Sequence, residues 1–411
     1  MAVSVATPTR NPNRSRYGQV FAIREFGFIF AAHAVSMLGT VIADISLSIL
    51  ILRRTGSPFL AALSFAVGFL PYIFAGTLLA GIADRFPART LLVTCNAAST
   101  ALVALMALPG QPVWALMSLR VAASTIQPVF TSARAASLPE VLDPDRYPLG
   151  RSLLRMVNQG AQVLGFAGGG LLLLAMAPRT ALWIDAGSFA VSAVLLRYGT
   201  SARPSRSRAW TGRISLVRDS LSGLAELWRL PRVRSLMLLW WTAPAFAAVP
   251  EGLAAPYARE IGSGSGGAGI LMAAAALGTI GGEAAIALLA GPAWRSRAVI
   301  PLAGCSLIPL LGFATCPGAG PAALLMSATG AADAYMIGLD QLFVDAVPDR
   351  LRGTAFSINL AGIMLTQSIA MSLGGAAAQF IDPHVVIAGS AVLGTGLILL
   401  VGRSIRRSSN A

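Results

Sequence analysis

Seven ionisable side chains lie inside long apolar stretches of this 411-residue sequence: Asp44, Arg120, Asp185, Glu251, Glu283, Asp333 and Asp340. A charged side chain at the centre of a bilayer costs roughly 2.5 to 3.5 kcal/mol on insertion scales, so one that persists there usually faces a cavity or a partner. Carboxyl groups in such places can bind and release protons. We single out all of them except Asp185 as candidate proton- or substrate-binding residues.

Asp44 and Arg120 fall at similar depths in two different apolar stretches, so we expect them to form an ion pair. In one interpretation, protonation of Asp44 releases Arg120 to hold another carboxylate or a substrate group. In the other, the two form a fixed structural ion pair. The sequence leaves both interpretations open.

The acids of the second half have no basic residue within an apolar stretch of that half to pair with. An unpaired buried carboxylate becomes neutral, so Glu283, Asp333 and Asp340 are each a proton carrier or a protonated hydrogen-bond donor. Asp333 and Asp340 are two helical turns apart, which predicts that they share one face of a helix. Glu251 is expected to reach an aqueous cavity, whereas Glu283 could instead bond to a neighbouring helix.

Several kinds of chemistry are excluded by what the sequence lacks. All 31 basic residues are arginine, so neither a Walker A lysine nor a lysine Schiff base is possible. No nucleophile and base pair is recognisable, and the cysteines and histidines show no metal-ligand spacing. We therefore expect no enzyme activity, no cofactor and no metal. The net charge of +14 does not indicate nucleic-acid binding, because the arginines lie between apolar blocks.

The elements that position these residues are apolar blocks long enough to cross a membrane. Hydrophobic residues make up 55% of the chain and charged residues 12%, against about one quarter charged in soluble domains. Blocks of about 20 residues span the hydrocarbon core of a bilayer. We predict an all-α integral membrane protein with twelve transmembrane helices at residues 26–52, 59–83, 89–109, 112–134, 150–176, 180–198, 234–257, 266–290, 297–316, 320–345, 353–380 and 384–402.

These blocks divide the chain into two six-helix bundles, 26–198 and 234–402, joined by an arginine-rich linker at 199–233. Polar tails cover 1–25 and 403–411, and the first shows no cleaved signal peptide. With the N-terminus inside, only Arg53, Arg54, Arg179 and Arg259 fall in outer loops, which satisfies the positive-inside rule. We expect both termini in the cytoplasm. The arginine- and alanine-rich composition is typical of a high-GC bacterium, which places the protein in a bacterial inner (plasma) membrane.

Residues 80–89, AGIADRFPAR, resemble the signature between helices two and three of the major facilitator superfamily, Gly-x-Leu-Ala-Asp-Arg-x-Gly-Arg-Arg. Asp84, Arg85 and Arg89 match this pattern, whereas Ala80, Pro87 and Ala88 depart from it. Residues 133–140, 183–189 and 347–353 are similar to further segments of the family. Together they resemble the branch that holds siderophore exporters and macrolide-efflux proteins.

The resemblance implies roles for two groups of residues. Asp84, Arg85 and Arg89 would form a cytoplasmic gate, in which Asp84 faces the positive N-terminal end of the helix that begins near Gly353. Gly165, Gly169 and Gly170 resemble part of the Gly-Pro-x-x-Gly-Gly motif of exporting antiporters, with Phe166 in place of the proline.

From this resemblance we expect a secondary active transporter of the major facilitator fold. Its function would be proton-coupled efflux of a small molecule, such as a drug, antibiotic or siderophore-like compound, by alternating access of the two halves. The partners would be that molecule, protons and membrane lipid, with no nucleic acid, and the chain would be a monomer. The alternatives are a proton symporter that imports a small solute, or a receptor or assembly factor that does not transport.

Overall fold

The computed structural model describes residues 17–74, 86–143, 146–203, 224–289 and 291–409. Its regular elements are all helices, and no strand occurs within these ranges. A helix satisfies its internal backbone N–H and C=O groups within one segment, which is why apolar segments adopt this form in lipid. The predicted all-α class is confirmed.

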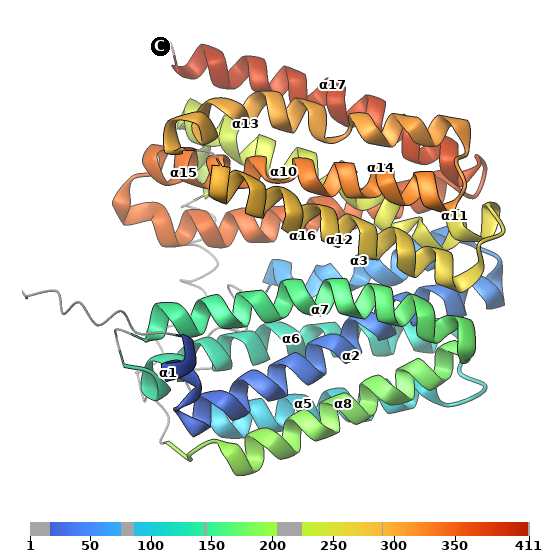
Figure 1. Cartoon of the computed structure of the whole chain (residues 1–411), viewed down its shortest axis with the longest axis vertical. Helices are drawn as coiled ribbons and strands as arrows, with labels where there is room; N and C mark the ends of the chain where they lie inside the picture. Colours follow the sequence, from blue (N-terminus) through green and yellow to red (C-terminus); the bar gives the residue numbers. More distant parts are fainter. Residues whose placement is uncertain (1–16, 75–85, 144–145, 204–223, 290, 410–411) are drawn as a thin grey trace, which may run out of the picture.

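The first half of the chain forms one group of helices, drawn in blue to green in Figure 1. A short helix, α1 (Tyr17–Phe21), precedes the long helix α2 (Arg24–Thr55). The helices that follow are α3 (Pro58–Phe74), α5 (Ala88–Ala107), α6 (Val113–Val141), α7 (Tyr147–Ala175) and α8 (Pro178–Gly199). They match the predicted blocks closely, except that α6 continues past residue 134 and that residues 75–83 lie outside the described ranges.

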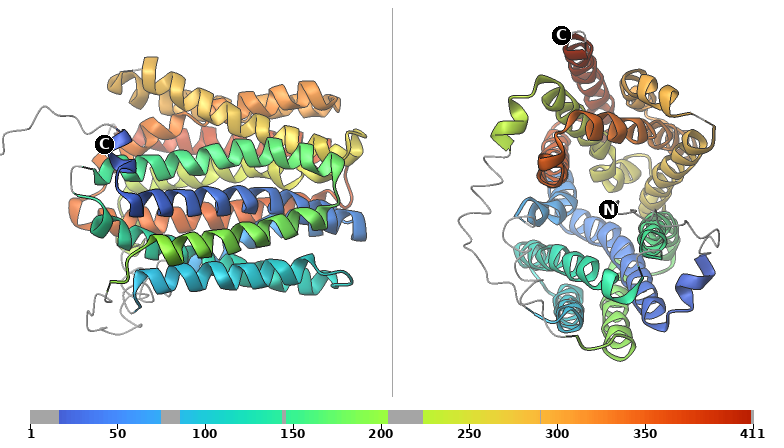
Figure 2. Two further views of the ribbon diagram at one scale, coloured as in Figure 1. Left: turned by 60° about the horizontal axis from the view of Figure 1, so that its bottom comes forward. Right: turned by 90° about the vertical axis from the view of Figure 1, so that its left-hand side faces the viewer.

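The second half lies beside the first and is drawn in yellow to red (Figures 1 and 2). Its elements are α10 (Pro231–Gly252), α11 (Ala254–Glu260), α12 (Gly264–Leu289), α13 (Pro292–Ser306), the 3₁₀ helix η2 (Ile308–Thr315), α14 (Ala319–Ala332), α15 (Tyr335–Ala346), the 3₁₀ helix η3 (Asp349–Leu351), α16 (Arg352–Ala377) and α17 (Pro383–Ser409). The axes of the long helices in both halves lie broadly parallel to one another (Figure 2).

Three predicted spans of the second half contain a bend, a turn or a change of helix type, although Arg297–Thr315 and Ala319–Ala346 still run as single spans. The segment predicted at 234–257 is α10 followed by α11, with a bend of 45°. Pro244 and Pro250 lie inside α10, and proline disturbs the backbone bonds of a helix. The segment at 297–316 passes from α13 into η2, and the segment at 320–345 is interrupted between α14 and α15 at Asp333.

The helices have the length and surface of membrane spans. Among the described residues, nine helices are long and apolar enough to cross a bilayer, and the bent α10–α11 pair makes a tenth. Large apolar side chains, including Leu288, Leu289, Leu324 and Leu393, are exposed on the outside of the molecule, as expected for surfaces that contact lipid. The chain is therefore a multi-pass membrane protein, and the count of twelve spans remains a prediction.

The two halves pack together where α3 contacts α16 and α7 contacts α12. We call the end opposite the chain termini the distal end; it carries the turns at residues 55–58 and 261–264. Near it, the Gln379 Nε2 donates to the Ser57 Oγ and the Ser368 Oγ donates to the Ala66 carbonyl, both at 2.8 Å. An apolar cluster with members from α2, α3, α10, α11, α12 and α16 lies in the same region. The halves are therefore in firm contact toward the distal end.

Small residues bring the backbones of α12 and α14 into contact. A methyl group on Gly278 would overlap the Ser327 carbonyl oxygen, and one on Gly282 would overlap the Ala331 carbonyl oxygen. Glycine at such positions allows helices to pack closely in lipid, where hydrophobicity cannot drive their association. This packing fixes the end of α14, where Asp333 begins the break.

Candidate functional site

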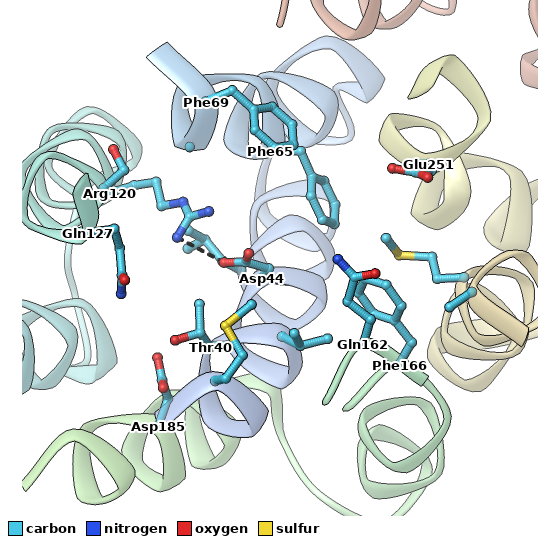
Figure 3. A pocket seen from close by; sticks show the side chains of 18 of the residues that line it. Thr40, Asp44, Phe65, Phe69, Arg120, Gln127, Gln162, Phe166, Asp185 and Glu251 are labelled. Atoms are coloured by element: carbon cyan, nitrogen blue, oxygen red, sulfur yellow. Dashed lines mark ion pairs between the residues drawn. The ribbon is translucent and has the colours of Figure 1, made fainter. Parts of the chain in front are cut away.

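A cavity of about 300 Å³ lies between the two halves (Figure 3). Its walls come from helices of both halves, α2, α3, α5, α6, α7 and α8 on one side and α10, α12, α14 and α16 on the other. The side chains that line it are mainly apolar and aromatic, with several polar groups among them. A mostly apolar cavity with a few convergent polar groups is the usual form of a small-molecule site.

Asp44 and Arg120 form an ion pair in this cavity, with 2.8 Å between the Arg120 Nη1 and the Asp44 Oδ1. α2 supplies Asp44 and α6 supplies Arg120 (Figure 3). The two side chains are 23% and 15% exposed, respectively. The ion pair predicted from the sequence is confirmed, whereas its role in transport is not decided by this contact.

A glycine on a third helix makes room for the guanidinium. A Cβ added to Gly68 of α3 would lie 2.5 Å from the Arg120 Nη2, far closer than van der Waals contact. The buried Arg120 Nε has no hydrogen-bond partner among the described residues. Arg120 is thus held at the cavity wall with hydrogen-bonding capacity that Asp44 does not use.

Asp185 of α8 is a third ionisable group beside this pair. Its side chain is buried, and electrostatic interactions link it to both Asp44 and Arg120. The Ser188 Oγ lies 3.2 Å from its Oδ1 and donates to its backbone carbonyl at 2.8 Å. A Cβ on Gly39 of α2 would lie 2.6 Å from the same Oδ1, so this glycine lets α8 approach α2 closely.

Uncharged polar residues also line the side of the cavity that the first half forms. Thr40, Gln127 and Gln162 line the cavity, and Figure 3 shows them around the ion pair. These three residues and Asp185 are not among the site residues predicted from the sequence. The available signal was a polar residue within an apolar block, which is common and therefore weakly informative.

Two of the predicted acids of the second half, Glu251 and Asp333, line the opposite wall. An electrostatic interaction links their carboxyl groups. Neither takes part in an ion pair within the described part of the chain. The cavity therefore carries four carboxyl groups, on Asp44, Asp185, Glu251 and Asp333, and the guanidinium of Arg120.

Glu283 and Asp340 do not line this cavity. Asp333 and Asp340 were predicted to share a helical face; the turn at Asp333 separates α14 from α15 within one span, and the shared face stays a prediction. Arg155 of α7 is near enough to Glu283 and Asp340 for a long-range electrostatic interaction, without an ion pair between them in the described part of the chain. A basic residue for these acids was expected only within the second half, whereas this one comes from the first.

Comparison with known proteins decides the family. The sequence profile of the Major Facilitator Superfamily matches residues 29–332 of this chain. The chain belongs to the Major Facilitator Superfamily. Members of this superfamily are transporters rather than enzymes, and a transporter of this type implies a small-molecule substrate.

Individual relatives are distant. The multidrug efflux pump Tap of Mycobacterium tuberculosis and Mycobacterium bovis is 28% identical over 249 residues, which are 57% of this chain and 56% of Tap. The chain thus matches only about half the length of these relatives. A peptide transporter solved with sulfate superposes with a TM-score of 0.74 at 12% identity, covering 96% of this chain and 99% of that one. A bacterial homologue of the lysosomal transporter Spinster, solved inward-facing and unoccupied, gives 0.68 at 15% identity over 94% and 98%.

The residues expected to form the superfamily gate are only partly described. Asp84 and Arg85 lie outside the described residues. Arg89, in the first turn of α5, donates from its Nη2 to the Arg197 carbonyl of α8. This bond lies within the first half, so the proposed gate contact with the second half stays a prediction.

The glycine motif that resembles that of superfamily antiporters packs α7 against α2. A Cβ on Gly165 would lie 2.7 Å from the Val41 Cβ, and one on Gly169 would lie 3.4 Å from the Ile42 Cα. The surroundings of Gly170 are outside what the structure describes. The motif therefore has a packing role here, and its link to transport direction is not tested by this geometry.

Proposed function

We propose that this protein exports a small, partly apolar and positively charged molecule in exchange for protons. The observation that carries the proposal is the Asp44–Arg120 ion pair, which lies within the cavity between the halves. The partial similarity to a multidrug efflux pump supports export over import.

The lining of the cavity supports the substrate class. Phe65, Phe69 and Phe166 offer aromatic surface, and Met272 and Met371 offer flexible apolar surface that adapts to different shapes. The four carboxyl groups can hold a cation once they release their protons, whereas Arg120, the one cationic group among the described residues that line the cavity, could hold an anion. An aromatic face also attracts a cation. A lipophilic cation combines these features.

Proton coupling would operate through a change of partners. When Asp44 takes up a proton, its attraction for Arg120 falls, and Asp185 is near enough to compete for the guanidinium. A cationic substrate and a proton would then compete for the same carboxyl groups. Binding of either one favours release of the other, as exchange transport requires.

Alternating access would use the contacts between the halves. Close contact toward the distal end would shut the cavity on that side, and the distribution of arginines supports an orientation in which that side faces outside the cell. In the other state, closer approach of Arg155 to Glu283 and Asp340, together with Asp84, would close the opposite side. The described arrangement would then correspond to an inward-facing state.

Everted membrane vesicles test the proposal. Respiration acidifies their interior, and the pH gradient can be followed by acridine orange fluorescence. Adding ethidium should partly collapse the gradient in vesicles that contain this protein, and vesicles with Arg120→Ala should respond like vesicles without it. A gradient unaffected by ethidium, tetraphenylphosphonium and a panel of cationic antibiotics would contradict export of this substrate class.

A further inference from the structure

Three side chains with metal-binding atoms meet at the distal end of the second half. Glu260 ends α11, Cys316 follows η2, and His384 lies in the first turn of α17. The candidate ligand atoms, one from each residue, all lie within 4.8 Å of one another. Their positions are far apart in the sequence, which is why no ligand spacing was visible there.

Hydrogen bonds already orient two of these groups. The His384 Nδ1 is bonded to the Glu260 Oε1, and the His384 backbone N–H donates to the Glu260 Oε2 at 3.2 Å. Each of these side chains is only 18% exposed. The second bond would hold the carboxylate in place if a metal took the position between the Glu260 Oε1 and the imidazole.

The cysteine is held beside them by its backbone. The Cys316 Sγ lies 3.9 Å from the Glu260 Oε1, and Cys316 is the one described residue other than glycine with a positive φ, at 48°. The hydroxyl of the buried Tyr257 donates to the Pro317 carbonyl at 2.5 Å and ties this turn to α11. The thiol is exposed, so a metal can reach it.

The electrostatic surroundings favour a cation. The carboxylates of Glu260 and Asp382 are near enough to the Cys316 thiol to interact with it electrostatically, and both would attract a cation. A bound metal ion would in turn stabilise the thiolate form of Cys316. Asp382 is also placed to approach as a fourth group, since it lies two residues before His384.

We propose that Glu260, Cys316 and His384 bind a Zn²⁺ ion. A carboxylate oxygen, an imidazole nitrogen and a thiolate sulfur are all established ligands of zinc, which prefers four ligands in tetrahedral geometry. Magnesium and calcium prefer oxygen ligands alone, so this mixed set selects against them. A water molecule or Asp382 would complete the tetrahedron.

Zinc at this place would join three segments of the second half. α11 is the distal part of the bent α10–α11 span, and it also contacts α2 and α3 of the first half. Linking α11 to the end of η2 and the start of α17 would restrain the segment through which the second half meets the first. This inference does not depend on the proposed transport function.

Zinc binding to the full-length protein tests the site. The protein is purified in detergent without a histidine tag, stripped with a chelator, and titrated with Zn²⁺ by isothermal calorimetry. One ion per chain should bind, and His384→Ala or Cys316→Ser should lower the affinity at least tenfold. The matched control is Cys305→Ser, which removes another exposed free thiol and should leave the affinity unchanged.

Two further measurements test the site even if His384→Ala or Cys316→Ser fails to fold. Zn²⁺ should slow maleimide labelling of Cys316 in a protein where Cys95 and Cys305 are serine, whereas Mg²⁺ should not. Co²⁺ should give the intense visible absorption of a tetrahedral site with a thiolate ligand in the unaltered protein. Unchanged labelling with Zn²⁺, or equal zinc affinity in the unaltered protein and Cys316→Ser, would overturn the proposal.

Discussion

Arg120 is the single residue on which the site depends most. Its guanidinium carries five N–H donors. The Nη1 forms the ion pair with Asp44, and the buried Nε has no hydrogen-bond partner within the described residues. Asp185 lies beside the pair without the short contact that Asp44 makes. Arg120 thus has two carboxyl groups nearby, with Asp44 closer than Asp185. This arrangement allows the guanidinium to change from one to the other.

Gly68→Ala should weaken coupling without unfolding the protein. The added methyl group would meet the Arg120 Nη2 at 2.5 Å, so the flexible guanidinium must move away from its place beside Asp44. We expect proton-driven transport in proteoliposomes to fall at least fivefold. Gly187→Ala, where nothing lies within 4 Å, is the control and should transport normally. Equal rates in both variants would refute a role for the Arg120 position.

Asp185→Asn should slow turnover while leaving the ion pair in place. Asparagine keeps the shape of the side chain but cannot ionise, so it cannot compete with Asp44 for Arg120 when Asp44 takes up a proton. We expect the maximal rate of proton-driven transport to fall about tenfold, with binding of a lipophilic cation weakened less. A maximal rate like that of the unaltered protein would show that Asp185 is only structural.

At the residue scale, sequence reasoning identified the charges but not all of their partners. The Asp44–Arg120 pair could be predicted because both groups fall at similar depth in apolar blocks. The electrostatic interaction of Glu283 and Asp340 with Arg155 could not, because Arg155 belongs to the other half and only the assembled fold brings it near. The cluster of Glu260, Cys316 and His384 could not be predicted either, because these residues are far apart in the sequence and meet only in the folded chain.

At the scale of the helices, glycine residues allow close packing that holds in place the side of the cavity formed by the second half. α12 and α14 touch backbone to backbone at Gly278 and Gly282, and α14 ends at the residue before Asp333. A shift between these helices would therefore move a carboxyl group of the cavity.

Gly282→Ala should destabilise the protein, whereas Gly281→Ala should not. The first methyl group would overlap the Ala331 carbonyl oxygen, and overpacking of this kind costs about 1–3 kcal/mol. The second would meet nothing within 4 Å. Thermal unfolding in detergent measures the difference, and a lower midpoint for Gly282→Ala alone is expected. Equal midpoints would mean that α12 and α14 are less tightly packed than described.

Helix positions were predictable because long apolar blocks bounded by arginine, proline and glycine carry a strong signal. The breaks were not predictable in the same way. Pro250 gives a physical reason for the bend after α10, but proline inside membrane helices is often tolerated. The break at Asp333 contains no proline, and the sequence gives no local reason for it.

At the scale of the whole molecule, the two halves meet most closely toward the distal end. The hydrogen bonds of Ser57 with Gln379 and of Ala66 with Ser368 both cross between them. Rocking of one half against the other would have to break these bonds to open that side.

A disulfide across this contact should stop transport. A Cβ on Gly252 of α10 would lie 3.5 Å from the Ala62 Cβ of α3, which falls in the range found for disulfides. The double variant Ala62→Cys with Gly252→Cys, in a chain whose native cysteines are serine, should lose transport on oxidation and regain it on reduction. Gly252→Cys alone should be insensitive to oxidant. Full transport by the oxidised double variant would argue against opening of the distal end.

Proton-driven flux by Asp44→Asn tests the central claim most directly. Proteoliposomes would contain the unaltered protein, Asp44→Asn, or Asp143→Asn, which removes an exposed carboxylate from a surface ion pair with Arg146. Tetraphenylphosphonium movement is then followed with and without a pH gradient. We predict that the gradient accelerates movement in the unaltered protein and in Asp143→Asn and has no effect in Asp44→Asn. Equal acceleration in all three would contradict proton coupling through Asp44.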